Sequence, residues 1–285
     1  MPGADTEGVR SGNEGGHQIA VVTGGARGLG FEIVRQLSSR GYTVVAADLD
    51  AGAVRGAHDG DDRVRPARLD VRDADACAEL AEAVTQEHGA LDVWVNNAGI
   101  LPTGPSWEIG AAPQRAVIEV NALGTVHGTL AALAQMRPVG HGAIVNVVSL
   151  AGLAPVPGMA AYSASKHAAL AWSLSTLGEL RAVGERNISI SCLCPAGIWT
   201  PMLQDKTDDF WASAPFGGRL LAPEDVAARA VRLIDRPRPV ACMPWFMGPV
   251  SRLVAASPRL ATVLTPMVMR AAAAQRRRTV RALQG

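Results

Sequence analysis

A tyrosine and a lysine four positions apart are the residues in this chain best suited to move a proton. The chain of 285 residues has only two tyrosines, and Tyr162 is followed at Lys166 by one of only two lysines. Residues four apart lie on the same face of a helix. A nearby ammonium favours the phenolate, so the pair predicts a general acid and base whose pKa lies below the ordinary value of about 10. The alternative is a surface pair on an alanine-rich helix.

Ser149 stands thirteen residues before Tyr162 and directly follows the apolar run 143–148. If that run is a strand of a parallel sheet, the serine lies at its carboxyl end, where such sheets hold their ligands. There its hydroxyl can donate a hydrogen bond to a substrate oxygen and stabilise the negative charge that develops on it. A serine after a strand can also be an ordinary turn residue. The spacing from Tyr162 favours the catalytic role.

A glycine-rich segment, TGGARGLG from Thr23 to Gly30, follows the first apolar run and leads directly into a helical pattern. Gly24 lets the chain turn, and Gly28 and Gly30, on either side of Leu29, let the backbone approach a pyrophosphate. The start of the helix supplies N–H groups and a positive dipole for that anion. The segment therefore predicts a dinucleotide-binding loop.

The second apolar run is followed by Asp48, 18 residues after Gly30. A carboxylate in this position accepts hydrogen bonds from the ribose hydroxyls of NAD and repels the 2′-phosphate of NADP. Arg27 points the other way, because an arginine in the glycine loop can pair with that phosphate. The two residues together favour NAD, with NADP as the alternative.

These residues need a frame that brings strand ends and helix starts to one edge. Short β-branched runs alternate with alanine-rich stretches, as in buried parallel strands joined by crossover helices. The predicted strands are 19–23, 43–47, 64–69, 91–95, 143–148, 188–193 and 239–243. The predicted helices include 28–40, 74–88, 114–135, 160–183 and 223–234. The prediction is an α/β fold: one doubly wound Rossmann domain over residues 17–244, with a parallel sheet of about seven strands.

The order of these motifs resembles the compact, single-domain branch of the short-chain dehydrogenase/reductases. The resemblance extends from Gln18 to Met243 and includes the TGxxxGxG and YxxxK spacings. In chain order the matching residues are Thr23–Gly30, Asp70-Val71, Asn96-Asn97-Ala98-Gly99, Asn121, Ser149, Tyr162 and Lys166. The resemblance implies an NAD(H)-dependent oxidoreductase that interconverts a secondary alcohol and a ketone, or an alcohol and an aldehyde, with the hydride chemistry supplied by the cofactor.

The resemblance also implies which residues hold the adenosine half of the cofactor. Asp70 and Val71 would hold the adenine. Asn97, Ala98 and Gly99 would pack against the adenosine ribose and stabilise the central strand.

At the nicotinamide end the resemblance gives Tyr162 and Lys166 a second role. Lys166 would bind the nicotinamide ribose, and Asn121 would hold a water that relays a proton from Lys166 to solvent. Asn121 as a polar residue that merely bends a helix is the alternative.

A further cofactor segment follows the sixth predicted strand. By resemblance, Pro195, Ile198 and Thr200 belong to it, and the last two would contact the nicotinamide. Ala196 stands where the family usually has a glycine, so the geometry of this segment is the part of the cofactor site that the motifs specify least.

The substrate side of the predicted site is apolar, which favours a lipid-like, steroid-like or aromatic alcohol over a sugar. Seven apolar residues flank it: Leu153, Val156, Met159, Trp199, Met202, Phe210 and Trp211. The alternative from another functional class is a non-catalytic nucleotide-binding regulator. Such a protein is expected to lack at least one of the four catalytic candidates, and this chain has them all. The resemblance further implies a homodimer or homotetramer.

The chain's charge is concentrated in residues 245–285. This tail has seven arginines and no acidic residue, so it carries +7, and the preceding residues carry −6 to give the net +1. Apolar residues lie between the arginines, which is the composition of an amphipathic helix on an anionic membrane. The alternative is a helix packed on its own subunit or a neighbouring one, with arginines facing solvent. Nucleic-acid binding is disfavoured because no binding fold accompanies the arginines.

The remaining composition favours a reducing compartment. The four cysteines form neither a CxxC pair nor any other metal-ligand spacing, so no metal is expected. Residues 1–16 are rich in glycine and polar residues, which predicts a disordered lead and not a secretory signal. We therefore expect a cytoplasmic protein, with membrane contact only through the tail.

Overall fold

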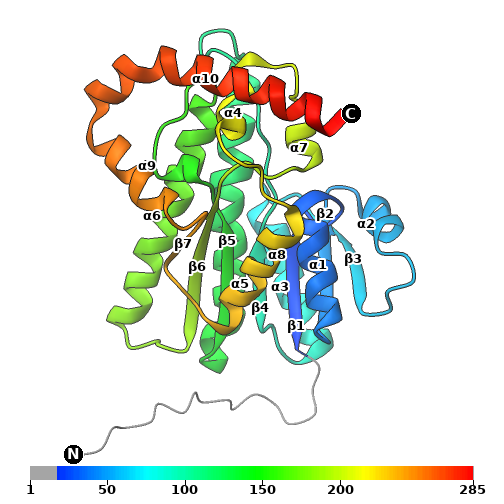
Figure 1. Ribbon diagram of the computed structural model, residues 1–285. Helices are drawn as coiled ribbons and strands as arrows, with labels where there is room; N and C mark the ends of the chain where they lie inside the picture. The colour runs from blue at the N-terminus through cyan, green and yellow to red at the C-terminus, as the bar shows by residue number, and fades with distance from the viewer. Residues whose placement is uncertain (1–17, 285) are drawn as a thin grey trace, which may run out of the picture.

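A seven-stranded parallel sheet forms the centre of the molecule (Figure 1). The structure is a computed structural model and describes residues 18–284, so the predicted disordered lead lies outside the described residues. The strand order is β3-β2-β1-β4-β5-β6-β7. The strands are β1 (Ile19–Thr23), β2 (Thr43–Asp48), β3 (Val64–Arg68), β4 (Val93–Asn96), β5 (Gly142–Val147), β6 (Ile188–Pro195) and β7 (Val240–Met243). The predicted doubly wound α/β fold is confirmed.

Helices cover both faces of the sheet because successive strand residues point to opposite sides. On one face, Ala20 and Val22 pack in a core with α1 (Gly28–Ser39) and α8 (Pro223–Asp235). On the other face, Ile19 and Val21 pack with α3 (Ala74–His88), α5 (Gly124–Val139) and α6 (Ala160–Ala182). Every residue of β1 is buried, which explains why its first four residues are all apolar.

The helix predicted at 114–135 is part of a longer helical stretch, residues 111–139. It consists of α4 (Ala111–Ile118), a π-helical turn η1 (Glu119–Leu123) and α5. Among the described residues, this stretch alone is long and apolar enough to cross a membrane, but more than half of its most apolar window is buried. It packs on α3 and α6, so it is a core helix of the α/β fold.

Short elements connect the strands on the carboxyl side of the sheet. They are α2 (Ala51–Ala57) after β2, η2 (Leu150–Gly152) after β5, and α7 (Pro201–Gln204), η3 (Phe210–Ala212) and η4 (Ala214–Gly217) after β6. Because the strand order reverses between β1 and β4, the crevice expected for a ligand lies outside the carboxyl ends of these two strands.

The tail forms two helices, α9 (Met247–Ala256) and α10 (Pro258–Gln284). Figure 1 shows α10 crossing above the carboxyl ends of the strands. Its second half packs on η4, as the self-packing alternative requires. Its first half and α9 leave several apolar side chains exposed, including Leu253, Leu260, Val263 and Met267. The second half of α10 is therefore packed on its own subunit, and the membrane alternative for the tail stays a prediction.

Candidate active site

The glycine loop between β1 and α1 has the geometry of a close backbone approach. Gly24 and Gly28 adopt φ angles of +68° and +57°, which residues with a side chain rarely adopt. A Cβ on Gly30 would lie 1.9 Å from the carbonyl oxygen of Gly24, so only glycine fits there. Leu29 is buried and anchors the first turn of α1. The loop leaves a shallow backbone surface at a helix start, which suits a pyrophosphate.

Asn97, directly after β4, ties this loop to the central strand. Its Nδ2 donates to the carbonyl oxygens of Thr23 and Gly24 at 3.0 and 3.1 Å. The backbone N–H groups of Asn97 and Ala98 both donate to Thr23 Oγ1, at 3.0 and 3.1 Å. These bonds hold the Asn97–Gly99 segment beside the glycine loop, in the position expected for residues that pack against a ribose.

Asp48 and Arg27 differ in their contacts with the rest of the loop. Asp48, the last residue of β2, accepts a hydrogen bond through Oδ2 from the backbone N–H of Ala26 at 3.3 Å. Arg27 caps the start of α1 and is exposed. The carboxylate therefore has a fixed position against the loop. This arrangement supports the predicted preference for NAD.

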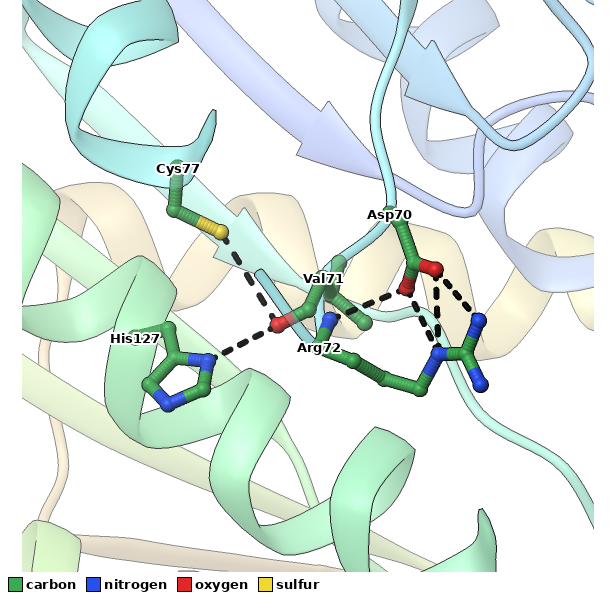
Figure 2. A network of polar contacts seen from close by, with 5 residues as sticks. All are labelled: Asp70, Val71, Arg72, Cys77 and His127. Atoms are coloured by element: carbon green, nitrogen blue, oxygen red, sulfur yellow. Dashed lines mark hydrogen bonds and ion pairs between the residues drawn. The ribbon is translucent and has the colours of Figure 1, made fainter. Parts of the chain in front are cut away.

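The segment after β3 is held by a network that Figure 2 shows in detail. The guanidinium of Arg72 pairs with Asp70, and its hydrogen bonds hold the pKa of that carboxyl below the ordinary value. The carbonyl oxygen of Val71 accepts hydrogen bonds from His127 Nδ1 at 3.0 Å and from Cys77 Sγ at 3.9 Å. The Asp70-Val71 backbone is thereby fixed by α3 and α5. Arg72 and His127 were not among the predicted site residues.

Tyr162 and Lys166 lie near one another at the start of α6. Lys166 is 4% exposed, its Nζ lies 5.7 Å from the Tyr162 ring centroid, and it donates to the carbonyl oxygen of Val147 at 2.8 Å. Burial lowers the pKa of Lys166 to about 8. Burial also raises the pKa of Tyr162, and a hydrogen bond with Ser149 opposes this only in part. The expected lowering of the tyrosine pKa is therefore wrong for the free protein, because desolvation of the phenolate outweighs the hydrogen bond with Ser149.

Ser149 is positioned by the turn that follows β5. It precedes η2, and its Oγ accepts a hydrogen bond from the backbone N–H of Ala151 at 3.1 Å. Ser149 thus caps the turn, which is the role expected of an ordinary turn residue. Because Oγ is the acceptor in that bond, the turn does not use the hydroxyl proton, which serves the hydrogen bond with Tyr162 in the free protein and could be donated to a substrate oxygen.

Asn121 lies in the π-helical turn and is completely buried. Its side chain pairs with the backbone of Ile100: Oδ1 accepts from the N–H at 2.9 Å and Nδ2 donates to the carbonyl at 3.0 Å. Nδ2 also lies 3.2 Å from Ser165 Oγ on α6. Asn121 therefore joins the loop after β4 to the helix that carries Tyr162. Irregular π-helical turns often accompany functional sites.

A second polar network, which sequence reasoning missed, lies in the core below the site. Asn96 Nδ2 donates to Asn146 Oδ1 at 2.9 Å, and Asn146 Nδ2 donates to Ser173 Oγ on α6 at 2.8 Å. Trp94 Nε1 donates to Asn96 Oδ1 at 2.8 Å. Two asparagines inside otherwise apolar strands were the signal, since a buried amide needs partners.

The segment after β6 closes over the glycine loop. Ala196 donates its backbone N–H to the carbonyl of Met243 at 2.8 Å, and no residue other than glycine has a positive φ in the described chain. Alanine is therefore accommodated where the family usually has glycine. Ile198 pairs with Leu221 in an isolated parallel bridge. A Cβ on Gly28 would lie 3.3 Å from Thr200 Cβ, so Thr200 lies directly over the loop.

The apolar residues predicted to flank the substrate do not form one surface. Leu153 and Met159 are buried, and Leu153 belongs to a core cluster with Leu170. Phe210 and Met202 are about two-fifths exposed, at 41% and 38%. The sequence pattern therefore includes packing residues as well as candidates for substrate contact.

Comparison with known proteins identifies the family of the chain. The family model for short chain dehydrogenases matches residues 18–211. A cis-4-hydroxycyclohexanecarboxylate dehydrogenase from Sinomonas cyclohexanicum is 36% identical over 217 residues, which are 74% of this chain and 86% of that protein. A 1-deoxy-11-beta-hydroxypentalenate dehydrogenase from Streptomyces exfoliatus is 35% identical over 222 residues, which are 74% of this chain and 77% of that protein.

A solved structure agrees with the fold over nearly its whole length. The crystal structure of a short chain dehydrogenase/reductase from Burkholderia phymatum in complex with NAD matches with a TM-score of 0.76 and 28% identity. The match covers 87% of this chain and 96% of that one. With its sheet order, its glycine loop and its matched family model, this chain belongs to the short-chain dehydrogenase family.

Proposed function

We propose that this protein is an NAD(H)-dependent dehydrogenase that interconverts a secondary alcohol and a ketone. The observation that carries the proposal is the grouping of Tyr162, the buried Lys166 and Ser149 at the carboxyl edge of the sheet. A buried lysine beside a tyrosine is an unfavourable arrangement for a purely structural pair, and perturbed groups of this kind concentrate at functional sites. A non-catalytic regulator would not need it.

The residues present fit a dinucleotide. Gly24, Gly28 and Gly30 form the loop that admits a pyrophosphate, and Asp48 would accept hydrogen bonds from the adenosine ribose. The related Burkholderia protein, crystallised in complex with NAD, supports the same cofactor here. The adenine would lie against Asp70 and Val71, the ribose against Asn97–Gly99, and the nicotinamide near Pro195, Ile198 and Thr200.

When bound, the nicotinamide supplies or accepts the hydride at the carbinol carbon. The chain's own residues manage the proton. Tyr162 donates its hydroxyl proton to the carbonyl oxygen during reduction and takes it back during oxidation. Ser149 donates a hydrogen bond to the same oxygen, and the Lys166 ammonium stabilises the phenolate that forms. Since burial raises the pKa of Tyr162, the free site holds a phenol, ready to donate.

An alcohol on an apolar carbon skeleton is the substrate class that fits best. The two related dehydrogenases are named for hydroxylated ring compounds, a hydroxycyclohexanecarboxylate and a hydroxypentalenate. The partly exposed Phe210 and Met202 would face such a skeleton. We use cis-4-hydroxycyclohexanecarboxylate, its methyl ester and cyclohexanol as test substrates.

The deciding experiment combines cofactor binding with turnover. NADH and NADPH are titrated by fluorescence against the wild type and Tyr162→Phe, and oxidation of the three alcohols is then followed. We expect NADH to bind at least about tenfold more tightly than NADPH, a difference of about 1.4 kcal/mol. We expect Tyr162→Phe to abolish turnover while NADH still binds. Tighter NADPH binding would contradict the role of Asp48, and no binding of either nucleotide would contradict the dehydrogenase.

The protein is also proposed to form a homodimer or homotetramer through the helices that carry Asn121 and Tyr162. Exposed apolar residues on this side support it, among them Leu130 on α5 and Val183 just after α6. Leu130→Arg is expected to give a smaller species in multi-angle light scattering, whereas Leu260→Arg on α10 is not. An unchanged mass in Leu130→Arg would contradict this interface.

A membrane-surface role for the tail is the second candidate, in an otherwise cytoplasmic protein. It rests on the exposed apolar residues of α9 and the first half of α10, which lie among exposed arginines. Sedimentation with anionic liposomes tests it, with Leu253→Asp/Val263→Asp as the variant. If the wild type stays in the supernatant, the membrane role is excluded.

A further inference from the structure

Two nitrogen atoms of the buried Arg276, on α10, have no hydrogen-bond partner in the described part of the chain. Its side chain is 6% exposed, and its Nε and Nη1 atoms are sealed from solvent with no hydrogen-bond partner among residues 18–284. The other six arginines of the tail are exposed. An unpaired buried charge is strongly unfavourable, and unsatisfied buried groups in native proteins call for an explanation such as an absent ion. Arg276 also lies outside the residues that the family model matches.

The position of Arg276 is set by a stripe of buried residues on α10. Met269, Ala272, Ala273 and Arg276 are all buried and lie on one helix face, at spacings of three, four and seven. This face packs on η4, where a Cβ on Gly217 would lie 3.8 Å from the Ala272 Cβ. Arg276 therefore lies on the face of α10 that packs on the segment following β6.

That segment is in turn packed against the loops that form the catalytic edge. Pro215 in η4 approaches Gly197 so closely that a Cβ there would lie 2.4 Å from the proline carbonyl oxygen. Trp211 approaches Gly158, just before the helix that carries Tyr162, in the same manner. Figure 1 shows α10 above this edge of the sheet. Arg276 thus belongs to the cover of the substrate side.

We propose that Arg276 binds an oxyanion of the ligand, and that this anion is a carboxylate on the alcohol substrate. A guanidinium matches a carboxylate with two parallel hydrogen bonds, and exclusion of water strengthens the pair. No carboxylate of the described chain bonds to the Nε or Nη1 of Arg276. Asp209, the acidic residue at the start of η3, is instead bonded to Thr103 and to the N–H of Trp211. This inference rests on the proposed dehydrogenase activity.

A phosphate of the dinucleotide has the same chemistry as a second source of the anion. The glycine loop that would hold the pyrophosphate follows β1, whereas η4 contacts the segments after β6 and before α6. The segments after β6 and before α6 flank the nicotinamide end of the site, where the substrate reacts. A substrate carboxylate is therefore the better match for Arg276 than a cofactor phosphate. The two sources predict different effects of the same substitution.

The test compares Arg276→Met with Arg277→Met, its exposed neighbour on the same helix, and with Arg276→Lys. Kinetics are measured with cis-4-hydroxycyclohexanecarboxylate and with its methyl ester, which lacks the charge. For Arg276→Met we expect kcat/KM to fall about thirtyfold for the acid, as for one lost charge-assisted hydrogen bond, and to change less than about threefold for the ester. Arg277→Met should change neither, and Arg276→Lys should recover part of the loss.

A second readout needs no turnover. Cyclohexanecarboxylate should raise the Tm of the wild type and of Arg277→Met, but not that of Arg276→Met, and the free Arg276→Met protein should melt no lower than the wild type. If no alcohol is oxidised and this pattern remains, the proposed function fails and the anion site stands. If Arg276→Met instead weakens NADH binding and affects acid and ester equally, the anion is a cofactor phosphate and the substrate assignment is overturned. Loss of Tm in Arg276→Met with no carboxylate effect in the wild type makes Arg276 structural and overturns the site.

Discussion

Lys166→Met is expected to remove a pH-dependent part of the protein's stability while abolishing turnover. Lys166 is 4% exposed, and burial lowers its pKa from 10.5 to about 8. Between these two values the unfolded chain binds the proton and the folded protein does not, so the wild type gains stability as the pH rises. Below pH 8 both states are protonated, and the folded protein carries the full cost of a buried ammonium.

The size of the effect follows from the difference between the two pKa values. A difference of 10.5 − 8, about 2.5 units, corresponds to about 3 kcal/mol over the whole range. From pH 7 to pH 9 alone, the free energy of unfolding of the wild type should rise by about 1 kcal/mol relative to Lys166→Met. At pH 7 the variant also leaves the Val147 carbonyl without its 2.8 Å partner, which costs about 1–3 kcal/mol. This cost offsets much of the stability that the variant gains by removing the buried ammonium.

The slope with pH is therefore the quantity to measure, since the lost hydrogen bond does not depend on pH. Urea unfolding at pH 7, 8 and 9, followed through tryptophan fluorescence, to which the buried Trp94 contributes, gives the free energies. Lys206→Met, which removes the other lysine of the chain, is the matched control and should run parallel to the wild type. If the wild type and Lys166→Met also stay parallel from pH 7 to pH 9, Lys166 is not desolvated and the reasoning is refuted.

Three further substitutions test the cofactor loop and the core. Asp48→Ala should weaken NADH binding about tenfold or more through lost hydrogen bonds and tighten NADPH binding, as measured by fluorescence titration; an unchanged NADH/NADPH ratio would assign the selectivity elsewhere. Gly30→Ala introduces a Cβ 1.9 Å from a carbonyl oxygen, so it should abolish NADH binding and lower the Tm; retained binding would mean that the loop is not the nucleotide site. Asn146→Ala removes the buried hydrogen bonds that Asn146 makes with Asn96 and Ser173 and should cost about 2–4 kcal/mol in urea unfolding; a loss below about 1 kcal/mol would show that water replaces the amide.

The fold was predictable because its strands are buried on both sides. A strand such as β1 has no polar alternation, and its boundaries, 19–23, were predicted correctly from the apolar run alone. At β4 the prediction began two residues early, at Leu91, because Leu91 is buried in the core although it lies before the strand. An apolar run indicates which residues are buried, but residues just outside a strand can be buried too, so the run can be longer than the strand.

The candidate site was predictable in its membership but not in its electrostatics. Spacing identified Tyr162 and Lys166 as neighbours on one helix. The direction of the tyrosine pKa shift depends on desolvation by residues that come from other elements, which spacing does not report. Arg276 was one of seven tail arginines with nothing in the sequence to distinguish it. Only the packing of α10 on η4 separates it from Arg277.

The amide pair between β4 and β5 determines how these two strands are aligned. Asn96 and Asn146 are direct partners in the parallel ladder, within strands whose other residues are apolar or glycine. A slip of one residue would turn one of the two amides to the opposite face of the sheet. The buried hydrogen bond between the two amides would then be lost. The pair thus favours one register between β4 and β5. Asn97 follows β4 and Ser149 lies just after β5, so the same register sets the position of the cofactor residue Asn97 relative to the substrate residue Ser149.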